Sequence, residues 1–211
     1  MVMADSVTEV LRSDILDGVF MPGERLIEVP LSERYDIGRA AIREALVQLE
    51  SEGLVDRQAN RGAVVRRVSI AEAIEITEAR SALESLITAR AARLATDEDK
   101  VSLREVIADM RDAVERDDPA AYSSLNLQLH KKLRDMSRHE VANEMVENLR
   151  NRAVQNQYRL ALMPGRREVS LEQHAAIVDA VVEGDEVGAA AAMTAHLSSV
   201  IDVLGQWGDR L

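Results

Sequence analysis

GRAAIREALVQLESEGLV, residues 38–55, is the most regularly patterned segment of the chain. Its apolar residues recur every three or four positions, and this spacing predicts a helix that ends at Gly53. Those residues are Ile42, Ala45, Leu46 and Leu49. Just upstream, Pro30 can open a shorter helix over residues 30–35, and a brief break separates the two helices. A short helix, a tight turn and a longer helix make a helix-turn-helix.

The segments on either side of this motif complete a winged domain. Residues 5–17 carry apolar side chains at helical spacing, which predicts a first helix. Downstream, residues 54–58 and 63–68 are short β-prone runs, and the Asn and Gly within residues 59–62 suit a hairpin turn between them. We therefore expect a winged helix-turn-helix with a small β-hairpin wing over residues 1–68.

The rest of the chain, residues 69–211, is expected to form an all-α domain. Capping patterns mark three helix starts: Ser69-Ile70-Ala71-Glu72, Asp118-Pro119 and Ser170-Leu171-Glu172-Gln173. Six helices are predicted, at about residues 70–95, 97–116, 119–136, 140–162, 170–183 and 186–207. Helices with such short connections pack as a bundle, so the fold class is mainly α.

Composition narrows the possible functions. No cysteine is present, which excludes disulfides and thiolate chemistry. Aromatic residues make up only 2% of the chain, so stacking on single-stranded nucleic acid is poorly supported. Neither a membrane-spanning apolar run nor a signal sequence is evident, which predicts a cytoplasmic protein that does not contact a membrane.

The net charge of −11 is an objection to DNA binding, because contacts to phosphate need positive charge. The charge is distributed unevenly, however. Residues 37–68 carry six Arg against four Asp and Glu, so this segment has a net charge of +2. Within it, Arg39 and Arg43 are one helical turn apart at the start of the predicted recognition helix, where side chains reach base edges. The planar fork of arginine suits the O6 and N7 atoms of guanine.

The N-terminal domain resembles the winged helix-turn-helix of the GntR family over about residues 7–66. The resemblance is carried by Pro22-Gly23-Glu24-Arg25-Leu26, by residues 38–50, by Glu52-Gly53-Leu54-Val55 and by Asn60-Arg61-Gly62-Ala63. It implies that double-stranded operator DNA is the partner and that the DNA-binding residues are Arg39, Arg43, Arg61, Gly62 and Arg25. Arg61 and Gly62 would form the wing tip, and Arg25 would contact phosphate or brace the domain.

One departure from the GntR pattern concerns the start of the recognition helix. Relatives usually have a hydroxyl residue before the first arginine and a Thr-Pro pair after it, whereas this chain has Gly38, Ala40 and Ala41. Hydroxyl groups can bond phosphate, so the operator sequence cannot be transferred from a relative.

Three of the four histidines lie on the inward stripes of three predicted helices: His130, His174 and His196. Asn126 precedes His130 by one helical turn and points the same way. A single inward histidine is usually a hydrogen-bonded core residue, whereas three on separate helices can converge on a metal ion. The spacing alone leaves both interpretations open.

The C-terminal domain resembles the FCD ligand-binding domain of the FadR subfamily of GntR regulators over about residues 70–205. The matching segments are Glu78-Ala79-Arg80-x-x-Leu83-Glu84, Asn126-x-x-x-His130, Glu172-Gln173-His174-x-x-Ile177 and Ala195-His196-Leu197. In that family an Asp and three His bind a divalent metal ion, which places the ligands here at Asn126, His130, His174 and His196. The metal implied is zinc, with manganese or nickel as alternatives. Asparagine brings no negative charge, so the metal affinity should be lower.

Arg80 lies on the buried stripe of its predicted helix, where a charge needs a partner. One candidate partner is Glu84, one turn further along the same helix. The other is a small carboxylate effector beside the metal, which is the role that the family gives to an arginine in this motif. An arginine fork and a metal together suit a carboxylate, so we favour the effector.

These observations favour a homodimeric transcriptional regulator, not an enzyme, in which an effector alters how two recognition helices meet a palindromic operator. The alternative is a metal-dependent hydrolase or lyase that uses the histidine cluster to activate water. No carboxylate follows the histidines at the spacing of a known general base, although Glu172 precedes His174 by two residues.

Overall fold

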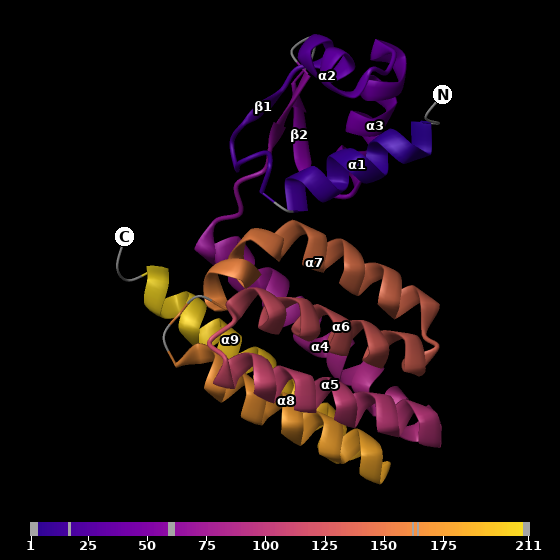
Figure 1. Cartoon of the computed structure of the whole chain (residues 1–211), viewed down its shortest axis with the longest axis vertical. Helices are drawn as coiled ribbons and strands as arrows, with labels where there is room; N and C mark the ends of the chain where they lie inside the picture. Colours follow the sequence, from indigo (N-terminus) through magenta and orange to yellow (C-terminus); the bar gives the residue numbers. More distant parts are fainter. Residues whose placement is uncertain (1–3, 17, 59–61, 162, 164, 209–211) are drawn as a thin grey trace. The chain divides into compact units, whose positions relative to one another are not determined.

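The computed structural model describes residues 4–16, 18–58, 62–161, 163 and 165–208 of the chain. Within these residues nine helices and one three-stranded sheet are present, which confirms the predicted mainly α fold class (Figure 1). The chain divides into two compact units. One contains Met1–Ser69 together with Arg150–Gln155, and the other contains Ile70–Leu149 and Asn156–Leu211. The domain limits of 1–68 and 69–211 stay a prediction.

The N-terminal unit is the predicted winged helix-turn-helix. Its helices are α1 (Ala4–Leu16), α2 (Glu28–Tyr35) and α3 (Arg39–Ser51), and its strands are β1 (Arg25–Leu26), β2 (Val55–Gln58) and β3 (Gly62–Val65). The apolar stripe of each helix is buried in one aliphatic core, which includes Leu11, Leu26, Ile42, Leu46 and Leu49. The guanidinium of Arg12 on α1 donates two hydrogen bonds of 2.7 Å to the carboxylate of Glu52, which caps the end of α3.

Two details of this unit differ from the sequence prediction. Strand β1 was not predicted, because two residues are too few to show an alternating pattern; it pairs antiparallel with β3, so the strand order is β1-β3-β2. Helix α2 begins at Glu28, two residues before Pro30. A proline is tolerated there because the first turn of a helix has no internal acceptor for its N–H groups.

Six helices build the C-terminal unit, although residues 150–155 of one of them are grouped with the N-terminal unit (Figure 1). They are α4 (Ile70–Leu94), α5 (Asp97–Glu115), α6 (Pro119–Ser137), α7 (Glu140–Ala161), α8 (Arg166–Glu183) and α9 (Glu186–Gly208). Helix α4 packs against α6, α8 and α9, and α5 packs against α6 and α8. The three histidine-bearing helices, α6, α8 and α9, therefore share α4 as a neighbour.

The predicted helix starts were partly right. Asp118 caps α6 as expected, since its side chain accepts a hydrogen bond from the backbone N–H of Ala121 and Pro119 follows. The capping box predicted at Ser170 is wrong. Helix α8 begins four residues earlier, at Arg166, after Gly165 in a left-handed conformation with φ of 75°. Ser170 is thereby buried inside the helix.

One helix among the described residues, α9 over Glu186–Gln206, is long and apolar enough to cross a membrane by length and composition alone. In the bundle, α9 packs along α4 and α8 and carries the buried His196. A single helix that passes this test is weak evidence for a membrane span, because helices of soluble proteins also pass it.

Candidate metal centre and nucleic-acid interface

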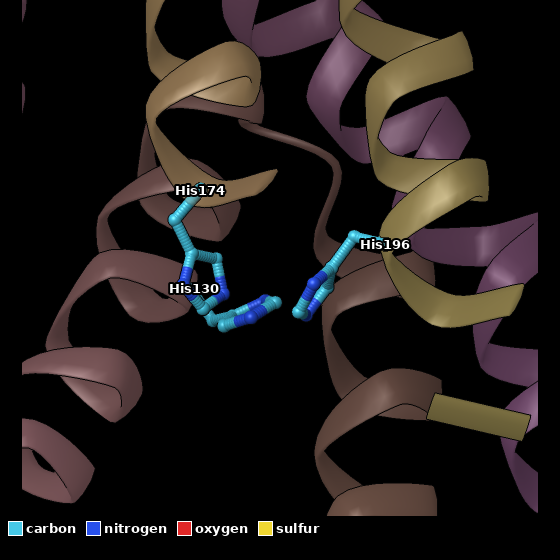
Figure 2. Close-up of side chains that lie close together, drawn as sticks. All are labelled: His130, His174 and His196. Atoms are coloured by element: carbon cyan, nitrogen blue, oxygen red, sulfur yellow. The ribbon is translucent and has the colours of Figure 1, made fainter. Parts of the chain in front are cut away.

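The structure brings together the three histidines that the sequence singled out. His130 on α6, His174 on α8 and His196 on α9 point their rings toward one another (Figure 2). Their nitrogen ligand atoms all lie within 4.8 Å of one another, and the three side chains are buried. The ring centroids of His174 and His196 are 4.4 Å apart, and that of His130 is 5.5 and 5.8 Å from theirs. The nitrogens are close enough for one ion to contact all three.

Each histidine has a partner at its Nδ1 atom. His130 Nδ1 is 2.8 Å from Oε2 of Glu84, His196 Nδ1 is 3.0 Å from Oε1 of Gln173, and His174 Nδ1 is 3.4 Å from the hydroxyl of Tyr122. A carboxylate or an amide oxygen only accepts, so His130 and His196 donate from Nδ1 and keep the lone pair of Nε2 for another bond. This is the arrangement in which outer hydrogen bonds orient metal-binding histidines.

Arg80 and Glu84 extend this network away from the histidines. Nε and Nη2 of Arg80 lie 2.8 and 2.7 Å from Oε1 of Glu84, and the side chains are 5% and 3% exposed. The intrahelical partner considered for Arg80 is therefore present. Because the other oxygen of Glu84 accepts from His130, a continuous chain of buried bonds links Arg80 to the histidine cluster.

Asn126, the fourth ligand implied by resemblance, lies one turn before His130 on α6. Its Oδ1 atom is buried and has no hydrogen-bond partner among the described residues. A buried carbonyl oxygen normally has a partner, so this oxygen could serve as a metal ligand. Three imidazoles and an amide oxygen are a donor set that zinc or nickel accepts. The residues present thus fit a metal ion.

The electrostatics of the centre favour a neutral His196. Burial lowers the pKa of His196 well below 6.5, and the nearby His130 and Arg166 lower it further. Arg166, at the start of α8, is itself buried; burial lowers its pKa, and its Nη1 donates a 2.6 Å hydrogen bond to the hydroxyl of Ser199. Metal ions bind neutral imidazole, so these pKa shifts act in the direction that binding requires.

Four residues of the centre were not assigned to it from the sequence: Glu84, Tyr122, Gln173 and Arg166. Two of them had a local signal, because Gln173 adjoins His174 and Tyr122 shares the inward stripe of α6 with His130. Glu84 is 46 residues from His130, and Arg166 lies before the predicted start of its helix. The sequence indicated Glu84 as a candidate partner of Arg80, but no local pattern indicates its bond to His130, and none indicates the position of Arg166.

The N-terminal unit exposes the two arginines predicted to read DNA. Arg39 and Arg43, in the first turns of α3, have side chains that are 61% and 56% exposed. Both face Glu28 at the start of α2, at N···O distances of 3.8 and 2.7 Å. Glu28 was not singled out from the sequence.

The wing residues are placed in part. Arg25 is exposed on β1, opposite Val64 of β3, and Gly62 is the first residue of β3. Gly62 has φ of +80°, and a Cβ atom added there would lie 2.2 Å from the carbonyl oxygen of Leu26. Only glycine fits that position. Arg61 lies outside the described residues.

Comparisons with known proteins agree with this architecture. The model of the family described as Bacterial regulatory proteins, gntR family, matches residues 3–65, and that of the FCD domain matches residues 75–199. The HTH-type transcriptional repressor RspR of Escherichia coli K12 is 28% identical over 200 residues, covering 95% of this chain and 88% of that protein. The HTH-type transcriptional regulator LutR of Bacillus subtilis 168 is 26% identical over 211 residues, covering 90% of this chain and 95% of that protein.

Solved structures share the fold along nearly the whole chain. E. coli McbR/YncC superposes with a TM-score of 0.83 at 24% identity, covering 98% of this chain and 99% of that one. A GntR-family transcriptional regulator from Pseudomonas syringae pv. tomato DC3000 superposes with a TM-score of 0.54 at 22% identity, covering 99% of this chain and 88% of that one. With a gntR-type winged helix-turn-helix followed by an FCD domain, this chain belongs to the GntR family of bacterial regulatory proteins and is a DNA-binding transcriptional regulator.

Proposed function

We propose that this regulator senses a small carboxylate at a metal centre in its FCD domain and that sensing alters its operator binding. The metal ligands are His130, His174, His196 and Asn126. The protein acts as a cytoplasmic homodimer of the FadR subfamily, and it is not an enzyme. The observation that carries this proposal is the convergence of three buried histidines from three helices, with ligand atoms within 4.8 Å of one another.

The outer hydrogen bonds support a metal site over a core of stacked histidines. A neutral imidazole has one donor nitrogen and one acceptor nitrogen, and two of these rings use the donor, Nδ1, on Glu84 and Gln173. Nε2 is then the nitrogen that carries the lone pair on each of these two rings. A divalent cation, when bound, would accept these lone pairs and offer an open position to a carboxylate oxygen.

Buried arginines support a carboxylate as the effector. Arg80 keeps Nη1 outside its bonds to Glu84, and Arg166 has no carboxylate partner among the described residues. Both lie close enough to lower the pKa of His196. A buried guanidinium with unused donors and a nearby metal suit an anionic group.

A thermal-shift screen tests the sensing proposal. Purified protein is stripped with a chelator and heated alone, with Zn²⁺, Mn²⁺ or Ni²⁺, and with each metal plus small mono-, di- and tricarboxylates. We expect a metal to raise Tm, a carboxylate to raise it further, and both shifts to disappear in His174→Ala. Equal Tm shifts in wild-type protein and His174→Ala under all conditions would contradict the proposal.

DNA reading is proposed to use Arg39 and Arg43 from α3, with Arg25, Arg61 and Gly62 at the wing. The exposure of both α3 arginines on the first turns of that helix supports this assignment. Arg43→Ala should abolish binding to the DNA upstream of the regulator's own gene, as measured by fluorescence anisotropy. Retained and salt-insensitive binding would contradict the assignment.

Catalysis at the histidine centre is the competing function. Glu84 is the carboxylate that touches the cluster, but its two oxygens are engaged by Arg80 and by His130 Nδ1, which suits an orienting role better than proton transfer. Turnover of a carboxylate substrate by wild-type protein, lost in His174→Ala, would favour the enzyme instead.

A further inference from the structure

Glu28 occupies a central position among the arginines of the DNA-binding unit. It is the first residue of α2, its side chain is 19% exposed, and its two oxygens accept from one guanidinium. The distances are 2.9 Å from Arg43 Nε to Oε1 and 2.7 Å from Arg43 Nη2 to Oε2. Arg39 Nη2 lies 3.8 Å from the same carboxylate. Glu28 therefore contacts both arginines of the α3 start.

This pairing leaves one edge of the Arg43 fork available. The guanidinium has five N–H donors in a rigid plane, and Glu28 takes the Nε–H and one Nη2–H. The other Nη2–H and the two Nη1–H groups point away from Glu28. A pair of parallel donors at this end of the fork matches the O6 and N7 acceptors of guanine.

Glu28 is less exposed than its partner. Its side chain is 19% exposed, whereas that of Arg43 is 56% exposed. The hydrogen bonds from Arg43 lower the pKa of Glu28, and the charges of Arg43, Arg39 and Arg57 lower it further. The carboxylate therefore stays ionised at neutral pH.

We propose that Glu28 is a positioning residue that holds the Arg43 fork with its Nη1 and Nη2 edge turned outward to read guanine. This inference rests on the proposed function, in which Arg43 contacts operator DNA. Arginine loses much rotational freedom when it binds a base, and a bidentate partner removes part of that loss before binding.

Loss of Glu28 should affect operator DNA and non-specific DNA differently, unlike loss of a simple surface ion pair. Glu28 also places a negative charge among DNA-facing arginines, which weakens attraction to phosphate at any sequence. Loss of Glu28 should therefore weaken binding to the correct operator while leaving non-specific binding unchanged or stronger. If the role of Glu28 were purely electrostatic, its loss would strengthen binding to the operator and to non-specific DNA alike.

The test compares variants on two duplexes. The operator is the sequence that full-length wild-type protein enriches from a random duplex pool, and its control is a scrambled duplex of the same composition. Glu28→Asp keeps the charge but shortens the side chain by one methylene, so it breaks the two-point contact alone. Glu28→Gln removes the charge. Glu33→Gln is the matched control, because Glu33 is exposed on the same helix and has no ion pair among the described residues.

We expect Glu28→Asp to weaken operator binding about tenfold, near the low end of the discrimination that one bidentate guanine contact supplies, with unchanged binding to the scrambled duplex. Glu28→Gln should lose a similar factor on the operator and bind the scrambled duplex as tightly or more tightly. Glu33→Gln should leave the ratio of the two affinities unchanged. In an Arg43→Lys background, which keeps the positive charge but lacks the planar fork, Glu28→Asp should have no further effect on operator binding.

Several results would overturn the inference. Equal operator affinity of Glu28→Asp and wild type would do so, as would a gain on both duplexes for Glu28→Gln. An additive loss in the Arg43→Lys background would show that Glu28 acts elsewhere. Circular dichroism and Tm of each variant verify folding. If wild-type protein enriches no sequence, both the proposed DNA reading and the role of Glu28 are wrong. If it enriches a sequence that the Glu28 variants bind as tightly as wild type, only the role of Glu28 is wrong.

Discussion

Glu84 and His130, 46 residues apart in sequence, form a buried hydrogen bond of 2.8 Å between Oε2 and Nδ1. The same carboxylate holds Arg80 through its other oxygen. This one side chain thus balances a buried arginine and orients a histidine of the proposed metal centre.

Replacing Glu84 should damage both roles. In Glu84→Gln the guanidinium of Arg80 loses its charged partner while it stays buried, and breaking such a pair commonly costs about 3 to 5 kcal/mol. Glutamine has one acceptor oxygen where glutamate has two, so it can accept from Arg80 or from His130 Nδ1 but not from both in this arrangement, and metal affinity should fall by about 10- to 100-fold. Urea unfolding and competition with a zinc chelator measure the two effects. The exposed Glu78→Gln on the same helix is the control and should change neither quantity.

Restoring a carboxylate at the fourth ligand position should strengthen the metal site. If Asn126 is the fourth ligand, Asn126→Asp would give the buried ligand oxygen a negative charge, so we expect affinity to rise by about tenfold, a typical effect of one residue at a metal centre. Isothermal titration with Zn²⁺ would measure this rise. Gln128→Glu adds the same charge on the exposed face of α6 and should leave the affinity unchanged. If both variants bind equally, Asn126 is not a ligand.

Gly62 is expected to tolerate no side chain. In Gly62→Ala the new Cβ would meet the Leu26 carbonyl oxygen at 2.2 Å and would require φ of +80°, so the β1–β3 pairing must shift. We expect a loss of about 1 to 3 kcal/mol in unfolding free energy, together with weaker operator binding. Gly38→Ala is the stability control, since nothing lies within 4 Å of its added Cβ. A Gly62→Ala protein as stable as Gly38→Ala would contradict this account of the wing.

Tyr35 should make the DNA-binding unit sensitive to alkali. Burial, followed by the hydrogen bond to Asp14, raises the pKa of Tyr35 above its ordinary value of 10. Because the folded pKa is the higher one, the contribution to stability is complete below pH 10 and is lost as the pH rises from 10 through the folded value. Urea unfolding at pH 8 to 11 should therefore show a steeper alkaline loss for wild type than for Tyr35→Phe. Parallel curves for the two proteins would contradict the prediction.

The architecture could be predicted from the sequence because its signals are local. The apolar period of residues 38–50 is set by helix geometry, and its stripe is buried as expected. The same reasoning placed His130, His174 and His196 on inward faces, and helices that share a core bring their inward faces together. The periodicity alone left two interpretations of the cluster open, core histidines or a metal site. Family resemblance then favoured the metal site.

The sequence by itself determined the winged helix-turn-helix, the helical bundle and the three inward histidines. Only the tertiary structure decided their partners: Glu84 for His130, Glu28 for Arg43, and β3 for the two residues of β1. The physical reason is that a helical stripe is encoded within a few turns, whereas a hydrogen bond between distant segments depends on how whole helices pack. From the sequence alone, a charged residue could equally be solvent-exposed or paired with a buried group, and only the packing of the helices distinguishes the two.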